Sequence, residues 1–206
     1  MATTQHQPGL IAILRGLTPT DAPEIGDALV DAGIRCLEVP LNSPDPFASI
    51  ELLADRLGDD VLVGAGTVIE LADVDRVRDV GGRLIVAPST DPAVIARTID
   101  LGLTSCPGVA TPTDVFTALR AGANSLKIFP AETVGIPGMR AWSAVVPDGT
   151  RFLPVGGVDA ATYPDWLAAG AAGAGIGSAL FTPGRRAEEV RQLASELVSI
   201  HHNHHP

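Results

Sequence analysis

Three residue types are scarce in this chain of 206 residues, and each shortage restricts the chemistry available to it. Lys127 is the only lysine, and every other basic side chain is arginine. The five histidines lie near the two ends, at His6 and within residues 201–205, which excludes a catalytic histidine or a histidine-ligated metal in the core. Cys36 and Cys106 fall within predicted strands, so we interpret both as buried thiols in a reducing compartment rather than as a disulfide.

The chain also lacks clustered positive charge and a long apolar run. Its formal net charge is −10, and no basic stripe is present to neutralise phosphates, which argues against nucleic acid as a partner. The first eight residues are polar and carry no secretory signal. Residues 166–184 are uncharged but interrupted by glycines and Pro183, so we read them as a helix end, a strand and a loop rather than a membrane span. We expect a soluble, cytoplasmic protein.

The hydrophobic content of 46% is sufficient for one substantial core, and a single domain over residues 9–199 is the simplest partition. We expect a polar N-terminal segment over residues 1–8. We also expect a histidine-rich tail over residues 200–206, which we predict to be disordered.

A repeated local pattern indicates alternating helices and strands. Helical runs end in glycine shortly before an apolar segment, as at Gly33 and Gly122. Strands are followed by a capping residue and a proline, at Thr18-Pro19, Ser43-Pro44, Asp91-Pro92 and Thr111-Pro112. This pattern predicts eight strands, over residues 10–14, 36–39, 61–63, 84–87, 104–106, 126–129, 152–155 and 174–177.

Eight strands separated by helices predict a closed (β/α)8 barrel of the TIM type. A doubly wound open sheet is the main alternative, but no glycine-rich dinucleotide turn follows the first predicted strand. In a barrel of this type the active site lies at the carboxyl ends of the strands. Charged residues near those ends are therefore the candidates for catalysis.

Three charged residues interrupt or end apolar strands: Arg15, Glu38 and Lys127. Glu38 and Lys127 each follow a helix-closing glycine by five residues, so we expect them at similar depth in the barrel. A lysine kept in a chain that otherwise uses arginine indicates a need for a free amine, because a guanidinium stays protonated. Burial and Arg15 would lower the lysine pKa, whereas Glu38 would oppose that. Structural ion pairs inside the barrel are the alternative.

Glycine-rich turns follow three strands. Turns at residues 155–158 and 175–179 come after the seventh and eighth strands, where this fold usually binds phosphate. The turn at residues 64–68 would let a ligand approach the backbone closely, and it also supplies the hydroxyl of Thr67. Phe129 and Pro130 would shape the wall of the cavity near Lys127. Glycines needed only for tight turns are the alternative.

Five segments carry a more specific signal along nearly the whole chain: residues 13–16 (ILRG), 37–44 (LEVPLNSP), 64–68 (GAGTV), 126–130 (LKIFP) and 155–158 (VGGV). Together they resemble the class I aldolases that split 2-keto-3-deoxy-6-phospho sugar acids. Within that family, residues 41–44 and Val155 resemble the phosphogalactonate branch, since the phosphogluconate branch typically has threonine before the glycine pair. Residues 131–139 depart from the family pattern.

The resemblance implies roles for the residues singled out above. Lys127 would be the Schiff-base lysine, and Glu38 the carboxylate that transfers protons. Arg15 and Thr67 would hold the carboxylate of pyruvate. The phosphate cradle would consist of Gly156, Gly157, Gly177 and Ser178.

The activity implied is cleavage of 2-dehydro-3-deoxy-6-phospho-D-galactonate to pyruvate and D-glyceraldehyde 3-phosphate, with no metal or organic cofactor. The gluconate epimer as main or additional substrate is one alternative. A non-catalytic barrel that binds phosphorylated sugar acids, or an isomerase that uses Glu38, is another. The resemblance also implies a homotrimer.

Overall fold

The structure is a computed structural model that describes residues 8–204. Nearly all of the polar N-terminal segment and the last two residues of the predicted tail therefore lie outside the described residues. In the part of the chain that is described, no helix combines the length and hydrophobicity needed to cross a membrane.

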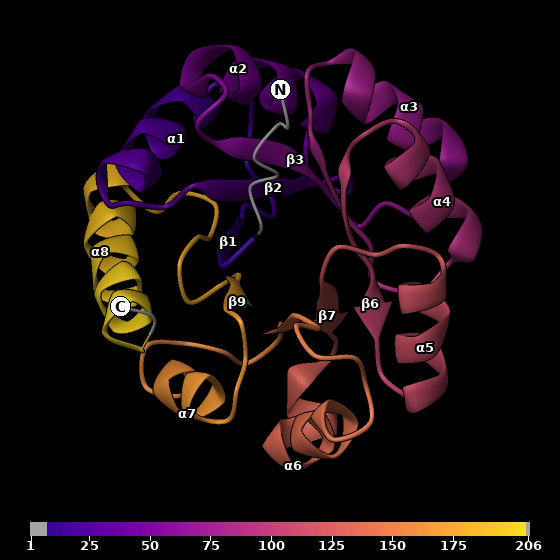
Figure 1. Ribbon diagram of the computed structural model, residues 1–206. Helices are drawn as coiled ribbons and strands as arrows, with labels where there is room; N and C mark the ends of the chain where they lie inside the picture. The colour runs from indigo at the N-terminus through magenta and orange to yellow at the C-terminus, as the bar shows by residue number, and fades with distance from the viewer. Residues whose placement is uncertain (1–7, 205–206) are drawn as a thin grey trace.

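Parallel strands form the inside of the molecule and helices form its outside (Figure 1). One sheet has the order β5-β4-β3-β2-β1-β9, and the other has the order β6-β7-β8. The strands are β1 (Leu10–Ile13), β2 (Cys36–Pro40), β3 (Leu62–Gly66), β4 (Leu84–Val86), β5 (Thr104–Cys106), β6 (Gly108–Val109), β7 (Leu126–Ile128), β8 (Phe152–Pro154) and β9 (Ala174–Ile176). All eight predicted strands are present within three residues of their expected bounds. β6 was not predicted, because Pro107 separates its two residues from β5.

The helices alternate with the strands along the chain. They are α1 (Ala22–Asp31), α2 (Pro46–Leu57), α3 (Leu71–Asp79), α4 (Pro92–Asp100), α5 (Pro112–Arg120), α6 (Ala131–Ser143), α7 (Tyr163–Ala168) and α8 (Ala187–His204). α1 packs against both α2 and α8, so the last helix lies beside the first (Figure 1). The uncharged stretch over residues 166–184 contains the end of α7, strand β9 and a loop, as predicted.

The strand order excludes the doubly wound alternative. Consecutive strands are neighbours from β1 to β5, and the last strand, β9, pairs with the first. A doubly wound sheet instead reverses its strand order at an internal point. Between the two sheets, Val155 and Gly175 form a parallel bridge, and the Ser105 carbonyl accepts hydrogen bonds from the Asn124 and Ser125 N–H groups.

Two of the four predicted helix starts are confirmed. The Asp91 carboxylate caps α4 by accepting hydrogen bonds from the N–H groups of Ala93 and Val94. Thr111 and Asp114 form a capping box at the start of α5, each side chain accepting from the backbone N–H of the other. Such caps satisfy N–H groups that have no partner inside the helix.

The other two predicted helix starts are wrong. Thr18 caps a turn that precedes α1, since its hydroxyl oxygen accepts from the N–H of Asp21, the residue that itself precedes the helix. The Ser43 hydroxyl accepts a hydrogen bond from the N–H of Gly16 at 3.0 Å, and α2 begins later, at Pro46. The Ser43 hydroxyl oxygen therefore binds a residue that follows β1 instead of capping the helix that follows it in the sequence.

The expectation of a disordered tail from residue 200 is also wrong, because α8 continues to His204. Its last turns are held by packing and by hydrogen bonds. Val198 and Ile200 pack against the core, and His201 Nδ1 lies 2.7 Å from the hydroxyl of Tyr163, whose ring stacks with the imidazole. His201 is therefore part of the fold rather than of a tail.

Candidate active site

Strand periodicity directs a continuous row of side chains to the interior of the sheet. A small buried cluster separate from the main core contains Ile11, Cys36, Leu62, Leu84, Val86, Cys106 and Leu153. Side chains two residues apart on a strand share a face. Glu38 therefore follows Cys36 on the interior face, and Lys127 lies there because its neighbours Leu126 and Ile128 belong to the main core on the other face.

Lys127 is a buried amine in largely apolar surroundings. Its exposed fraction is 5%, and its Nζ lies 4.7 Å from the centre of the Phe129 ring. Burial lowers the pKa of the amine and Arg15 acts in the same direction, whereas Glu38 and Cys106 oppose the shift. A lowered pKa increases the fraction of neutral amine, which is the form that attacks a carbonyl carbon.

Glu38 is the buried acid beside this amine, with an exposed fraction of 1%. Burial raises the pKa of its carboxyl group to about 7, although the charges of Lys127 and Arg15 act against the rise. Its Oε2 atom has no hydrogen-bond partner among the residues that the structure describes. A carboxyl group with a pKa near neutrality can both accept and donate a proton during one reaction cycle.

Gly66, the last residue of β3, provides the space that the Glu38 carboxylate occupies. A Cβ atom at Gly66 would lie 1.9 Å from Glu38 Oε2, so no other residue fits there without moving the carboxylate. The next residue, Thr67, has φ = 59°, which is unfavourable for a β-branched side chain. Such backbone strain costs on the order of 1–3 kcal/mol and is typical of functional sites. The role of Gly66 was not predicted individually, although the glycine-rich motif indicated a close approach of the backbone.

Arg15 is exposed just after the end of β1, and its side chain is held by the loop that follows β2. Its Nη1 donates a hydrogen bond to Asn42 Oδ1 at 2.6 Å. The adjacent Ser43–Gly16 hydrogen bond joins the same two segments. Asn42 was not predicted as a site residue, and its place within the motif at residues 41–44 was the only signal for it.

A cavity of about 370 Å³ opens next to Arg15 at the carboxyl ends of the strands. It brings together most of the residues predicted to bind substrate: Arg15, Phe129, Val155, Gly156, Gly157, Gly177 and Ser178. Lys127, Glu38 and Thr67 are not among its lining residues. Phe129 connects the two parts of the site, because its side chain lines the cavity and its ring also contacts the Lys127 amine.

Two carboxylates border the glycine turns of this cavity, and neither was predicted. The Asp159 carboxylate accepts hydrogen bonds from the N–H groups of Ala161 and Thr162 and from the Thr162 hydroxyl, which lowers its pKa. Glu132 lies over the glycine pair, since a Cβ at Gly157 would be 2.7 Å from its Cγ. Glu132 belongs to the segment that departs from the family pattern.

Within residues 8–204, no group of three or more histidine, cysteine, aspartate or glutamate side chains could hold a metal ion. The lowered pKa of the Lys127 amine and the raised pKa of the Glu38 carboxyl group suit these groups to amine chemistry and proton transfer. An amine of lowered pKa can form an imine with a ketone, and a neighbouring carboxyl group with a pKa near neutrality can supply and remove the protons that imine formation and hydrolysis require.

Comparison with known proteins gives a consistent result. The family described as "Aldolase: KDPG and KHG aldolase" matches residues 3–194. The chain is 46% identical over 192 residues to a "Probable 2-dehydro-3-deoxy-6-phosphogalactonate aldolase" of Rhizobium meliloti, covering 93% of this chain and 91% of that one. It is 44% identical over 192 residues to the 2-dehydro-3-deoxy-6-phosphogalactonate aldolase of Escherichia coli, covering 93% and 94%.

A solved structure described as "Native KDPGal structure" superposes with a TM-score of 0.94 at 43% sequence identity, covering 97% of both chains. Both the family match and the coverage extend over nearly the whole fold, including the buried lysine, the buried glutamate and the glycine turns. The chain therefore belongs to the KDPG and KHG aldolase family.

Proposed function

We propose that the protein cleaves 2-dehydro-3-deoxy-6-phospho-D-galactonate to pyruvate and D-glyceraldehyde 3-phosphate by Schiff-base chemistry at Lys127. The observation that carries the proposal is a single buried lysine whose pKa is lowered by burial, next to a buried glutamate with a pKa of about 7. The identity to two aldolases named for this substrate supports the choice of sugar acid.

In the first stage, the neutral Lys127 amine attacks C2 of the keto acid to form a carbinolamine. Protonation of its hydroxyl by Glu38 expels water and leaves a protonated imine. Glu38 then takes the proton of the C4 hydroxyl as the C3–C4 bond breaks, and the bonding electrons move into the imine. This step releases glyceraldehyde 3-phosphate and leaves an enamine of pyruvate on Lys127.

In the second stage, Glu38 returns its proton to C3 of the enamine, which restores the imine. Water then attacks C2 and its proton returns to Glu38, which regenerates the Lys127 amine and the protonated carboxyl group and releases pyruvate. A carboxyl group with a pKa of about 7 suits this alternation, because neither of its protonation states is strongly disfavoured near neutral pH.

Substrate positioning is assigned to groups that line the cavity and to Thr67, which directly follows β3. Arg15 and Thr67 would hold the carboxylate next to C2, with Asn42 fixing the direction of the Arg15 guanidinium. The backbone N–H groups of the two glycine turns would hold the phosphate, which supplies binding energy remote from the bond that breaks. The cavity lined by these turns has about the volume needed for a small sugar phosphate.

We also propose that the strands close into a (β/α)8 barrel in which β5 and β6 together form one strand interrupted at Pro107. The Val155–Gly175 bridge supports closure on one side. On the other side, the Lys127 N–H donates to the Pro107 carbonyl, and the Asn124 N–H donates to the Ser105 carbonyl. Closure would hold the ends of β2 and β7 in a fixed relation and so keep Glu38 beside Lys127.

Borohydride trapping tests the reaction. Incubation with pyruvate and sodium borohydride should add a reduced pyruvyl group to one peptide, the peptide that contains Lys127. Lys127→Arg is the matched control, because it keeps the positive charge and removes the nucleophilic amine. An unlabelled Lys127 in folded protein would exclude the Schiff-base mechanism. A binding protein or an isomerase would then be the remaining hypotheses.

The gluconate epimer remains the second candidate substrate, and Val155 is the position that separates the two. Val155 is buried against Gly175 and lines the cavity. Val155→Thr adds a hydroxyl at almost constant volume, so it should raise kcat/KM for the gluconate epimer relative to the galactonate epimer. An unchanged ratio would contradict the assignment of selectivity to this residue.

We propose a homotrimer on the basis of the resemblance, and a cytoplasmic location on the basis of the composition and the polar first residues. Sedimentation equilibrium over a range of protein concentrations would test the assembly. A mass other than that of three chains would contradict it.

A further inference from the structure

A second cavity lies at the opposite end of the strands from the active site. Its volume is about 260 Å³, and its wall includes Leu10, Cys36 and Leu62, which are the first residues of β1, β2 and β3. Arg15, by contrast, comes after the last residue of β1. Because the strands are parallel, a ligand in this second cavity would be separated from the active site by the buried interior cluster.

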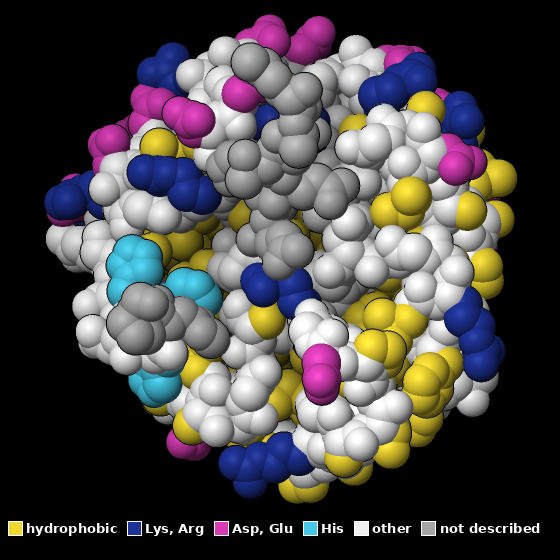
Figure 2. Space-filling view, in the orientation of Figure 1, with side chains coloured by type: hydrophobic (Ala, Val, Ile, Leu, Met, Phe, Trp, Pro, Cys, Tyr) yellow, Lys and Arg dark blue, Asp and Glu magenta, His cyan; other side chains and the backbone are white. Residues whose placement is uncertain are grey.

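Positively charged and ionisable basic side chains surround the second cavity. Arg35, Arg151, His201 and His202 all line it, and they come from three separate parts of the chain. Among the described residues that line it there is no aspartate or glutamate. Figure 2 shows histidine and arginine side chains on this face of the molecule. In a chain with a net charge of −10, such a lining is unusual and would attract an anion.

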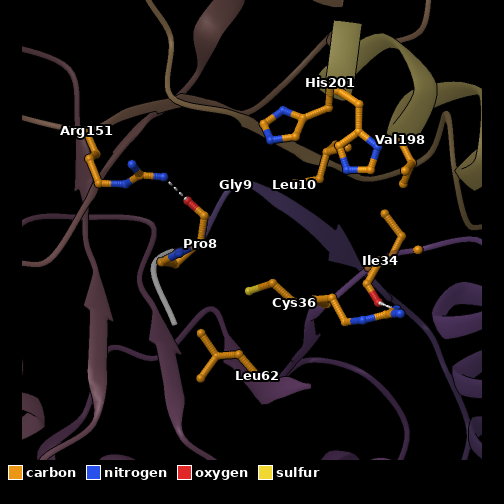
Figure 3. A pocket seen from close by; sticks show the side chains of 12 residues that line it. Pro8, Gly9, Leu10, Ile34, Cys36, Leu62, Arg151, Val198 and His201 are labelled. Carbon is orange, nitrogen blue, oxygen red and sulfur yellow. Dashed lines mark hydrogen bonds between the residues drawn. The ribbon is translucent and has the colours of Figure 1, made fainter. Parts of the chain in front are cut away.

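Arg151 provides an unused hydrogen-bond donor. It directly precedes β8, and its Nη2 donates to the Pro8 carbonyl at 2.9 Å (Figure 3). Its Nε is buried without a hydrogen-bond partner among the described residues. A buried donor left unsatisfied is unfavourable, so a ligand oxygen that accepts a hydrogen bond from Nε would be favoured.

The remaining wall of the cavity is apolar. Leu10, Ile34, Cys36, Leu62 and Val198 border the space between Arg151 and the end of α8 (Figure 3). Nearby, His201 is oriented by its contact with the Tyr163 hydroxyl. The combination is an apolar floor with basic groups at its rim.

We propose that this cavity binds a small organic anion, whose carboxylate or phosphate group pairs with Arg151 and whose short hydrocarbon body rests on the apolar wall. Arginine suits either head group, because its planar donors match the oxygens of both. The volume limits the ligand to about the size of a single ring or a short chain. Such a ligand would not compete with the substrate, since the two sites lie at opposite strand ends.

Isothermal titration calorimetry with benzoate and with phenyl phosphate tests the proposal. The titrations use full-length Gly177→Glu protein, in which a carboxylate blocks the phosphate cradle of the active site. This substitution should be tolerated, since a Cβ at Gly177 meets no atom within 4 Å. At least one probe should bind with a one-to-one stoichiometry, and the two probes distinguish a carboxylate ligand from a phosphate ligand.

Arg151→Met in the same background should weaken that binding at least about tenfold, the loss expected for a charge-assisted hydrogen bond. Arg83→Met is the matched control, because Arg83 directly precedes β4 as Arg151 precedes β8, and it does not line the cavity. Equal affinity in the two variants, or no binding of either probe to Gly177→Glu protein, would overturn the proposal.

Loss of the Pro8 contact could unfold the Arg151 variant, so His202→Leu provides a second test. His202 is exposed and lines the cavity. Its replacement should weaken binding several-fold without changing the circular dichroism spectrum. Unchanged affinity in a folded His202→Leu protein would place the anion elsewhere.

Discussion

Replacement of Glu38 by glutamine should make the protein more stable at pH 8 and change its stability little at pH 4. In the folded protein, burial raises the pKa of Glu38 from 4.5 to about 7. Between these values the folded state keeps a proton that the unfolded chain has released, so stability falls as the pH rises through this window. The difference in pKa corresponds to at most about 3 kcal/mol above pH 7.

The pKa of about 7 already includes the attraction of the ionised carboxylate to the Lys127 ammonium, which acts against the rise. The expected increase in stability is therefore positive and at most about 3 kcal/mol. A stabilising effect of an active-site substitution is expected where function requires an uncompensated buried charge.

Urea unfolding followed by circular dichroism between pH 4 and pH 8 measures the effect. The difference in unfolding free energy between Glu38→Gln and the wild type should grow with pH and level off above about pH 7. Glu132→Gln controls for the loss of one carboxylate, because Glu132 is exposed. A difference that is constant over this range would refute the assignment of a raised pKa to Glu38.

Further predictions concern catalysis. Glu38→Gln should abolish the rise of kcat with pH that is centred near pH 7 in the wild type, and a rise kept in the variant would assign it to another group. Lys127→Arg should lose both cleavage and borohydride trapping while remaining folded; residual cleavage above the buffer rate would contradict imine catalysis. Gly66→Ala places a Cβ 1.9 Å from Glu38 Oε2, so kcat should fall about 100-fold with little change in KM. Asn42→Ala removes the partner of Arg15, so KM should rise about three- to tenfold and kcat should change less, whereas an equal loss in kcat would indicate a different role.

The arrangement of strands could be predicted from sequence because its signals are local. Glycines such as Gly33 and Gly122 have φ of 100° and 91°, a conformation that other residues adopt at a cost, so they mark helix ends reliably. The distance from such a glycine to the next strand then places Glu38 and Lys127 on their strands. Glu38 and Lys127 both lie on the interior face of the strands and are buried, which agrees with their equal spacing from the preceding glycines.

Contacts between distant segments were harder to predict. Ser43 was expected to cap a helix, but its hydroxyl binds the Gly16 N–H, because the fold brings the ends of β1 and β2 together. His201 was expected in a disordered tail, but α8 carries it to the Tyr163 hydroxyl. A side chain that could bind several chemically equivalent partners binds the one that the fold brings near. Which segment is near depends on contacts between residues that are far apart in the sequence.

The sequence by itself determined the succession of helices and strands, the one lysine available as a nucleophile, and the glycine turns at the carboxyl ends of the strands. Only the tertiary structure decided how these groups act on one another. Burial gives Glu38 a pKa of about 7, Gly66 leaves room for its carboxylate, and Asn42 holds Arg15. The physical reason is that pKa values and side-chain directions depend on solvent exclusion and on neighbours from other strands, which exist only once the chain has folded.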